Sequence, residues 1–371
     1  MRVLVAPDSF GDSMTATEAA TAVTDGWLEV RPDDELEAVP LSDGGPGLLS
    51  ALEATLPDAV MVAVDASGPD GEPLQASVLH AGATAYIESA LACGLRLLRE
   101  SGGSIRTATT YGVGQLLAAA AALDGVDTVV IGLGGSGTND GGAGLWAGLG
   151  GEPVDALRQG GIALADLDRV TPPTTLGVTV VVATDVDNPL LGLHGATAVY
   201  GPQKGADRGD VLALDAALAH WADVVEAATG RAGLRDLPGA GAAGGLGFGL
   251  LALGAERRSG IDLVIELVGL RERLADVDLV VTGEGCYDSQ SLRGKAVSGV
   301  ARLASEAGVP CVVAAGSVEV GRREAAAAGV EETWSIADRF GSRGAAIEAG
   351  ADGLRAVARD IAGAWSRGHS T

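Results

Sequence analysis

A glycine-rich stretch that follows one apolar run carries the side chains best suited to chemistry. The run Val129–Ile131 has the β-branched composition and the length of a buried strand. Glycine then occupies positions 132, 134, 135, 137, 141, 142 and 144, and the polar residues between them are Ser136, Thr138, Asn139 and Asp140. Glycines at a strand end let successive backbone N–H groups turn toward one ligand, and such groups form an anion site. The stretch therefore predicts a phosphate site, with or without a metal ion.

Three other interpretations of this stretch have to be weighed. The first is a tight strand-to-helix turn capped by Asn139 or Asp140. The second is a dinucleotide site, because Gly132–Gly137 fits G-x-G-x-x-G after a strand. That motif should continue into an apolar helix and a second strand ending in an acid, whereas Thr138–Gly142 interrupts the helix and Glu152 precedes a proline. The third, a P-loop, is excluded because no G-x-x-x-x-G-K-[ST] occurs.

Composition narrows the class of protein. A chain of 371 residues is long enough for two domains. Its formal net charge of −24 disfavours nucleic acid and anionic membranes as partners. We expect no membrane span, because glycines break every long apolar run, and no signal peptide, because the N-terminus leads directly into a strand. Three widely spaced cysteines without metal-ligand spacing suggest a reducing compartment, and we expect the cytoplasm.

The chain contains few lysines, and all of them lie in similar sequence surroundings. Of 25 basic residues only Lys204 and Lys295 are lysines, and both lie in glycine-rich segments. A lysine supplies a compact point charge where arginine supplies a planar fork. Their placement therefore indicates a role beside the phosphate site, with chance placement as the alternative.

Acidic residues follow several of the predicted strands. Asp8 follows the strand Val3–Ala6, and Asp43 follows a strand at about 36–40. A helix at about 16–30, which begins with the capping box Thr15–Glu18, separates these strands, and another at about 46–56 follows the second; this alternation favours a parallel sheet. Asp185 and Glu284 follow later strands in the same way. Ligands bind at the carboxyl edge of such sheets, so we expect these side chains to approach one ligand.

The pattern changes between residues 59 and 89. Short apolar runs are separated there by turns such as Gly68–Gly71, which predicts antiparallel hairpins and a domain boundary near residue 60.

In the last helix we expect one buried stripe, formed by Ile347, Leu354, Val357, Ile361 and Trp365.

Seven segments together resemble one family, the bacterial two-domain glycerate kinases. They are APDSF (6–10), SDGG (42–45), ATTYG (108–112), IGLGGSGTNDGGAG (131–144), TDVDNPLLG to YGPQKGA (184–206), PGAGAAGGLG (238–247) and TGEG to GK (282–295). The resemblance implies ATP- and Mg²⁺-dependent phosphorylation of D-glycerate, commonly at the 2-hydroxyl. It also implies an α/β fold with a flavodoxin-like parallel-sheet domain built from both chain ends, 1–60 plus 275–371. A mixed α/β domain, 61–274, is inserted, with the active site in the cleft between the two.

Phosphoryl transfer needs the phosphates held, their charge neutralised and an acceptor hydroxyl oriented. For phosphate and nucleotide contacts we expect Gly134, Gly135, Ser136, Thr138, Asn139, Asp140, Gly141 and Lys204. For substrate binding we expect Asp8, Ser9, Asp43, Gly44, Gly45, Ser289 and Gln290. For catalysis we expect Asp185 or Asp288 as the base and Lys295 for charge neutralisation. Asp43 and Glu284 are the expected Mg²⁺ ligands, since Mg²⁺ usually takes one or two carboxylates with waters.

Three positions depart from the pattern of the family. Gly11 stands where lysine is usual, Pro46 where glutamate is usual, and Cys286 where arginine is usual. Each lost cation removes a charged contact worth about 1.5–3 kcal/mol. Three explanations follow: the acceptor is a different hydroxy acid or a polyol, a residue such as Arg293 compensates for the lost charge, or the protein is a non-catalytic descendant. A dehydrogenase is the remaining alternative function. The expected partners are a small-molecule substrate and a nucleotide, with a homodimer left open and neither nucleic acid nor membrane.

Overall fold

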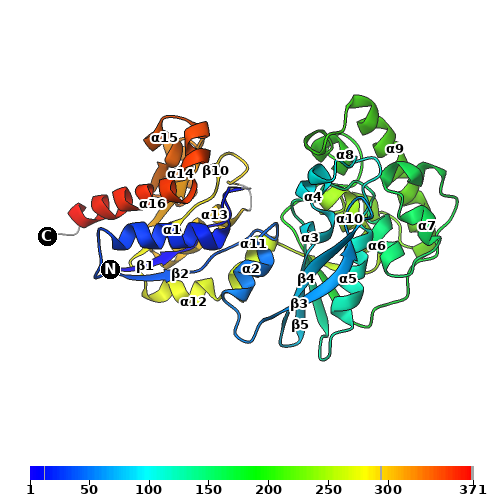
Figure 1. Cartoon of the computed structure of the whole chain (residues 1–371), viewed down its shortest axis with the longest axis horizontal. Helices are drawn as coiled ribbons and strands as arrows, with labels where there is room; N and C mark the ends of the chain where they lie inside the picture. Colours follow the sequence, from blue (N-terminus) through cyan, green and yellow to red (C-terminus); the bar gives the residue numbers. More distant parts are fainter. Residues whose placement is uncertain (12, 293–294, 369–371) are drawn as a thin grey trace. The chain divides into compact units, whose positions relative to one another are not determined.

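The chain divides into two compact units, which are described separately. The computed structural model describes the backbone of residues 1–11, 13–292 and 295–368, and Figure 1 shows the helices and strands. The terminal unit comprises Met1–Asp43, Ser50–Leu56 and Ile261–Thr371. The middle unit comprises Gly44–Leu49 and Pro57–Gly260. Each unit has its own apolar core.

Parallel strands form the sheet of the terminal unit. Within the described residues their order is β13-β11-β9-β1-β2. The bounds are β1 Arg2–Val5, β2 Glu35–Ala38, β9 Leu279–Thr282, β11 Cys311–Ala315 and β13 Glu332–Ser335, with a separate parallel pair of β10 Cys286–Tyr287 and β12 Ser317–Val318. The three central strands, β1, β9 and β11, are almost entirely buried. Their continuous apolar runs are typical of parallel strands that helices cover on both faces.

Helices complete the terminal unit. They are α1 Ala16–Leu28, α11 Gly260–Leu267, α12 Leu270–Arg273, α13 Ala296–Ala307, α14 Arg322–Ala327, α15 Ile336–Phe340 and α16 Arg343–Gly368, with α2 Leu48–Glu53 having residues in both units. Helix α1 begins with the predicted capping box, in which Thr15 and Glu18 bond each other's backbone N–H groups. Figure 1 shows α1 beside α16. Gly26 permits this close approach, because a Cβ there would lie 2.2 Å from the carbonyl oxygen of Arg355.

The predicted apolar stripe of the last helix is wrong at its first member. Leu354, Val357 and Ile361 are buried, but Ile347 is 68% exposed. The cause is a break in α16 at Gly350, whose φ of 47° and ψ of −129° are not helical. A break rotates the preceding turn relative to the following ones, so a residue in phase by sequence spacing no longer faces the core.

The sheet of the middle unit combines both kinds of pairing. Its order is β3-β4-β5-β6-β7-β8, with bounds β3 Val60–Ser67, β4 Pro73–Ala81, β5 Thr84–Glu88, β6 Thr128–Gly132, β7 Thr179–Ala183 and β8 Glu256–Arg258. The pairs β3–β4 and β4–β5 are antiparallel, as the hairpin pattern predicted. From β5 to β8 the pairing is parallel. The predicted α/β class with parallel sheets is therefore confirmed.

The helices of the middle unit surround this sheet (Figure 1). They are α3 Ala90–Cys93, α4 Leu95–Glu100, α5 Tyr111–Ala121, α6 Ala143–Gly148, α7 Val154–Leu157, α8 Ala196–Tyr200, α9 Arg208–Thr229 and α10 Ala242–Ala252, with 3₁₀ turns at Gly161–Asp166, Pro202–Lys204 and Leu234–Asp236 and, in the terminal unit, Leu274–Asp276. Trp146 and Trp221 pack edge to face in the core, with ring centroids 5.4 Å apart. In the described part of the chain no helix combines the length and hydropathy that a membrane span needs.

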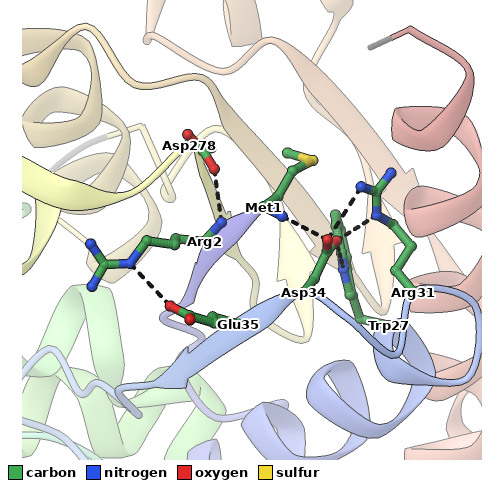
Figure 2. Close-up of polar contacts among 7 residues, drawn as sticks. All are labelled: Met1, Arg2, Trp27, Arg31, Asp34, Glu35 and Asp278. Carbon is green, nitrogen blue, oxygen red and sulfur yellow. Dashed lines mark hydrogen bonds and ion pairs between the residues drawn. The ribbon is translucent and has the colours of Figure 1, made fainter. Parts of the chain in front are cut away.

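One buried carboxylate ties the first strand of the terminal unit to the end of α1. Figure 2 shows Asp34 accepting hydrogen bonds from the Met1 ammonium group, at 2.6 Å, and from Trp27 Nε1, at 2.9 Å, beside an ion pair with Arg31. Burial opposes ionisation of Asp34, but the bonds from Arg31, Met1 and Trp27 outweigh it and lower the pKa to about 2. Asp34 is thus ionised and fully paired at neutral pH.

Replacement of this carboxylate should therefore weaken the terminal unit in a pH-dependent way. We expect Asp34→Asn to lower the free energy of unfolding at neutral pH by about 1–2 kcal/mol. Because the folded-state pKa is depressed, this contribution is complete above the unfolded pKa and declines as pH falls; at about pH 3 roughly half should remain. Urea unfolding of both proteins across this pH range measures the difference. A difference that stays constant down to about pH 3 would contradict the assignment.

Candidate functional site

The loop after β6 presents backbone N–H groups that the protein leaves unused. Leu133 N bonds to Ala183 O, and Gly137 N bonds to Cys93 O. Between them, the N–H groups of Gly134, Gly135 and Ser136 have no hydrogen-bond acceptor among the described residues. Gly135 is exposed and has a φ of +65°, a left-handed conformation that glycine adopts without strain. Consecutive free N–H groups around such a residue are suited to an anion such as phosphate.

Asp140 holds the second half of this loop from inside. Its carboxylate is fully buried and accepts four hydrogen bonds. Thr110 donates two of them, from N at 2.7 Å and from Oγ1 at 2.9 Å, and the N–H groups of Gly142 and Gly144 donate the others, each at 3.1 Å. Burial raises the pKa of Asp140, and the bonds from Thr110, Gly144 and Gly142 oppose this rise. Its oxygens are occupied by the protein, so Asp140 shapes the loop and its side chain is not turned to a ligand.

Lys204 holds the first half of the loop. Its side chain is buried, and Nζ donates to Ser136 Oγ and to the carbonyl oxygen of Thr138, each at 2.8 Å. Burial lowers the pKa of Lys204 to about 8, although Cys93 and Asp140 act in the opposite direction. The ammonium group thus contacts the side chain of Ser136, one of the residues whose N–H groups lack an acceptor among the described residues. Asn139 is also fully buried, and its Nδ2 donates to Thr197 Oγ1.

Glycine contacts on two sides fix where the loop lies. On one side is the segment Gly44–Leu49, where a Cβ at Gly132 would be 2.3 Å from Gly44 O and one at Gly134 would be 2.4 Å from Gly45 Cα. On the other side is the start of α10, where Ala243, Gly244 and Gly245 have positive φ. A Cβ at Gly244 would be 2.0 Å from Thr138 O. The glycines of three predicted motifs therefore serve backbone packing against one another.

A second set of predicted residues gathers in the terminal unit, after strands β1, β2 and β9. Asp8 follows β1, and its N–H bonds to Gly283 O after β9. Burial raises the pKa of Asp8 well above its usual value; Asp43 and Glu284 raise it further, whereas the Ser9 N–H group and Lys295 lower it. Lys295 Nζ lies 3.6 Å from Glu284 Oε2. These four side chains thus act on one another electrostatically, as predicted for neighbouring strand ends.

Glu284 has one oxygen without a partner. Its side chain is 8% exposed, and Oε1 has no hydrogen-bond partner among the described residues. Burial raises the pKa of Glu284, and Ser291 and Lys295 oppose this while Asp288 and Asp43 reinforce it. A buried carboxylate oxygen left unpaired is costly, so it indicates a place for a donor or a cation from a ligand.

The two candidates for the base are both engaged by backbone groups. Asp288 Oδ1 accepts the N–H groups of Gln290 and Ser291, at 2.7 Å and 3.2 Å, and so closes a turn that leaves Ser289 and Gln290 exposed. Asp185 follows β7 in the middle unit, where its Oδ1 accepts the N–H group of Gly260 at 3.1 Å.

The three departures from the family pattern lie in two places. A Cβ at Gly285 would be 3.1 Å from the carbonyl carbon of Phe10 and 3.4 Å from Gly11 N, so Gly11 lies beside the segment that carries Cys286. Pro46 lies in the middle unit, where its Cγ would be 2.6 Å from a Cβ at Gly135. The two lost cations thus come from one region of the terminal unit. Arg293, the predicted replacement, lies outside the described residues.

Two contributors were not singled out from the sequence. Thr110 lies within a quoted motif, but nothing in its spacing indicated that it would bond Asp140, 30 residues away. Glu88 ends β5 and is buried, and its Oε2 accepts the N–H group of Gly47 at 2.9 Å. A signal for Glu88 existed, because it is an acid at the end of an apolar run, like Asp8 and Asp185.

Removal of the charge at Asp140 should disturb the loop without changing its volume. In Asp140→Asn an amide NH₂ group faces N–H donors, and we expect a loss of about 2–4 kcal/mol in the free energy of unfolding. Asp155→Asn is the matched control, because this exposed aspartate should change stability by less than about 0.5 kcal/mol. Urea unfolding measures both, and equal stabilities of the two variants would refute the role of Asp140.

Lys204 should give the middle unit an unusual rise in stability at alkaline pH. Between about pH 7 and 9.5 the unfolded chain keeps the lysine proton and the folded chain loses it, so this group should add about 2 kcal/mol to the free energy of unfolding. The rise should be absent from Lys204→Met. Both proteins should also carry Cys93→Ala, because burial raises the pKa of that neighbouring thiol to about 12. Identical pH profiles with and without Lys204 would show that its pKa is not lowered.

Comparison with known proteins agrees with the sequence motifs. Residues 3–366 match the profile of the Glycerate kinase family. The chain is 41% identical to a glycerate kinase of Bacillus subtilis (strain 168), with 98% of this chain and 97% of that protein covered. It is 38% identical to a glycerate 2-kinase of Escherichia coli (strain K12), with the same coverage.

A solved structure extends the similarity to three dimensions. It is the crystal structure of a Salmonella typhimurium LT2 protein assigned as glycerate kinase 2, with a TM-score of 0.79 and 36% identity. The match covers 100% of this chain and 99% of that one. With its profile, its relatives and its fold in agreement over nearly the whole length, this chain belongs to the glycerate kinase family.

Proposed function

We propose that this protein transfers the γ-phosphoryl group of ATP to D-glycerate, at the 2-hydroxyl. Membership of the family and the names of its relatives support the reaction, and the name of the E. coli relative supports the position. The observation that carries the proposal is the row of free N–H groups at Gly134, Gly135 and Ser136. The chain as a whole has a net charge of −24, which disfavours anions, but this row of N–H donors forms a local site suited to a polyphosphate.

The phosphates would be held by backbone groups rather than by a fork of charged side chains. Gly134, Gly135 and Ser136 present N–H donors, and Lys204 adds a positive charge in contact with Ser136. In this proposal Thr138, Asn139, Asp140 and Gly141 contribute by fixing the path of the backbone. A site assembled in advance stabilises developing charge without reorganisation during the reaction.

Mg²⁺ fits the acidic residues of the terminal unit. Mg²⁺ commonly binds one or two carboxylates and completes its shell with waters and phosphate oxygens, so a cage of protein ligands is not required. Glu284 offers a buried oxygen with no partner among the described residues, and Asp43 lies close enough to raise the pKa of Glu284. These two carboxylates would hold the ion, which when bound neutralises charge on the phosphates.

The same cluster contains the groups proposed to hold the acceptor. Asp8, Ser9 and Asp43, with Gly44, Gly45, Ser289 and Gln290, are the proposed contacts of the substrate. Lys295, 3.6 Å from Glu284, would neutralise charge on the substrate or the transferred group. Asp185 or Asp288 would accept the proton of the attacking hydroxyl, and both remain candidates.

We also propose the finer assignments of fold and setting. The strand order β13-β11-β9-β1-β2 supports a flavodoxin-like domain, whose order along the chain is 2-1-3-4-5. The division into a terminal and a middle unit supports two domains with a first bound near 60, whereas the second division falls at Gly260–Ile261 and not at the predicted 275. Three free cysteines are consistent with a cytoplasmic location. The cleft between the domains and the homodimer stay predictions.

A second acceptor is favoured by one specific observation. Gly11 and the segment of Cys286 are neighbours, so both departures remove a cation from a single place. That place lies beside Asp8 and Glu284, two carboxylates that disfavour an anion. A hydroxy compound with less negative charge than glycerate, such as a polyol, is therefore the alternative substrate.

A coupled assay of ADP release tests the proposal. We expect turnover with D-glycerate that requires Mg²⁺, and a phosphoglycerate product whose position NMR identifies. Glu284→Gln should lower kcat at least about tenfold, a loss typical of perturbed metal sites. The exposed Glu331→Gln is the control and should leave kcat unchanged. Turnover with a polyol but not with D-glycerate would favour the alternative, and nucleotide binding without any turnover would indicate a non-catalytic descendant.

A further inference from the structure

Glu88 is a buried carboxylate whose identified hydrogen-bonding partners are backbone groups. It is the last residue of β5 and lies opposite Gly132, the last residue of β6. Its side chain is 6% exposed, and Oε2 accepts the N–H group of Gly47 at 2.9 Å. Burial raises the pKa of Glu88, whereas the N–H groups of Gly47, Leu49 and Leu48 lower it. The Glu88 carboxylate is thus hydrogen-bonded to Gly47 and lies close to the backbone of the two residues that follow it.

Those residues belong to the segment Gly44–Leu49, which packs on the glycine loop. A Cβ at Gly132, Gly134 or Gly135 would come within 2.6 Å of an atom of Gly44, Gly45 or Pro46 respectively. Contacts this close leave no room for the segment to shift toward the loop. The hydrogen bond from Gly47 to Glu88, which pairs with Gly132 at the start of the loop, limits the movement of the segment further. The position of the segment is thus fixed by glycine packing and by one carboxylate.

The segment is continuous in sequence with one proposed site residue and packs against two others. Its first residue directly follows Asp43, a proposed ligand of Mg²⁺ and substrate. Its Gly45 and Pro46 abut Gly134 and Gly135, whose N–H groups are free. A displacement of the segment would therefore alter the phosphate loop and the start of the chain leading to Asp43.

We propose that Glu88 is a positioning residue for phosphoryl transfer, which holds the Gly44–Leu49 segment against the Gly132–Gly135 loop through the N–H group of Gly47. This inference rests on the proposed function. Glu88 acts through the backbone and touches neither nucleotide nor acceptor. A buried carboxylate is poor evidence for stability alone, because a neutral group of similar shape often serves as well. The role proposed for Glu88 is therefore to fix the position of the Gly44–Leu49 segment.

The experiment compares Glu88→Gln with Asp34→Asn in the full-length protein. Both native side chains are carboxylates with little solvent exposure, and the partners of Asp34 are Met1, Trp27 and Arg31, none of which is a proposed site residue. Steady-state kinetics give kcat and the KM for ATP and D-glycerate, and thermal unfolding gives Tm. Amide hydrogen exchange reports peptides covering 44–49 and 132–137. Glu88→Asp is the second variant, because it keeps the charge but is too short to reach Gly47.

We expect Glu88→Gln and Glu88→Asp to lower kcat by about 10- to 100-fold, as small displacements of a site do. Their losses in Tm should be no larger than that of Asp34→Asn, which should keep its kcat. Exchange should accelerate in both peptides in the Glu88 variants only. Unchanged kcat and unchanged exchange in Glu88→Gln would overturn the inference, as would losses of kcat that follow Tm equally in all three variants.

Hydrogen exchange also separates this inference from the proposed function. If the wild-type protein does not phosphorylate glycerate, the proposed function fails. Faster exchange of both peptides in Glu88→Gln then still supports the positioning of the loop, and unchanged exchange overturns it. If the wild-type protein is active, kinetics and exchange test Glu88 together.

Discussion

The candidate phosphate site depends on backbone segments that approach one another more closely than any side chain permits. Gly132 and Gly134 lie against Gly44 and Gly45, and Gly244 lies against Thr138. Because a Cβ at Gly132, Gly134 or Gly244 would fall within 2.4 Å of a backbone atom, the loop is confined between two other segments. In this loop the N–H groups of Gly134–Ser136 have no acceptor among the described residues, and Gly135 is exposed, so an anion can approach this part of the backbone. These motifs are thus rich in glycine because their backbones pack closely together, and the capacity to bind an anion depends on that packing.

Buried charged side chains also hold these backbone segments in place. Lys204 supports the first half of the loop, Asp140 the second half, and Glu88 the neighbouring segment. Each of these charges meets neutral donors or acceptors of the backbone or of a hydroxyl group. Such an arrangement fixes geometry and keeps the strong charges away from the solvent face of the site. It also explains how a chain of net charge −24 can present a surface fit for phosphate.

The sequence predicted the elements well, whereas the hydrogen-bond partners of individual side chains could not be derived from it. Parallel strands, hairpins after residue 60 and the capping box of α1 follow from local patterns, because each depends on residues close in the chain. The neighbourhood of Asp8, Asp43, Glu284 and Lys295 followed from the rule that parallel strands end at one edge. By contrast, Asp140 is bound by Thr110 and not turned outward, which depends on a contact that no spacing reveals. The break at Gly350 was missed because a single glycine in a helical pattern is often tolerated.

The scarcity of lysine has a practical consequence for chemical labelling. Of the two lysine side chains, that of Lys204 is enclosed by the protein, whereas that of Lys295 is 35% exposed. An amine-directed reagent therefore has a single accessible ε-amino group, and it lies 3.6 Å from Glu284. A fluorophore or an affinity tag attached there would report directly on the acidic cluster.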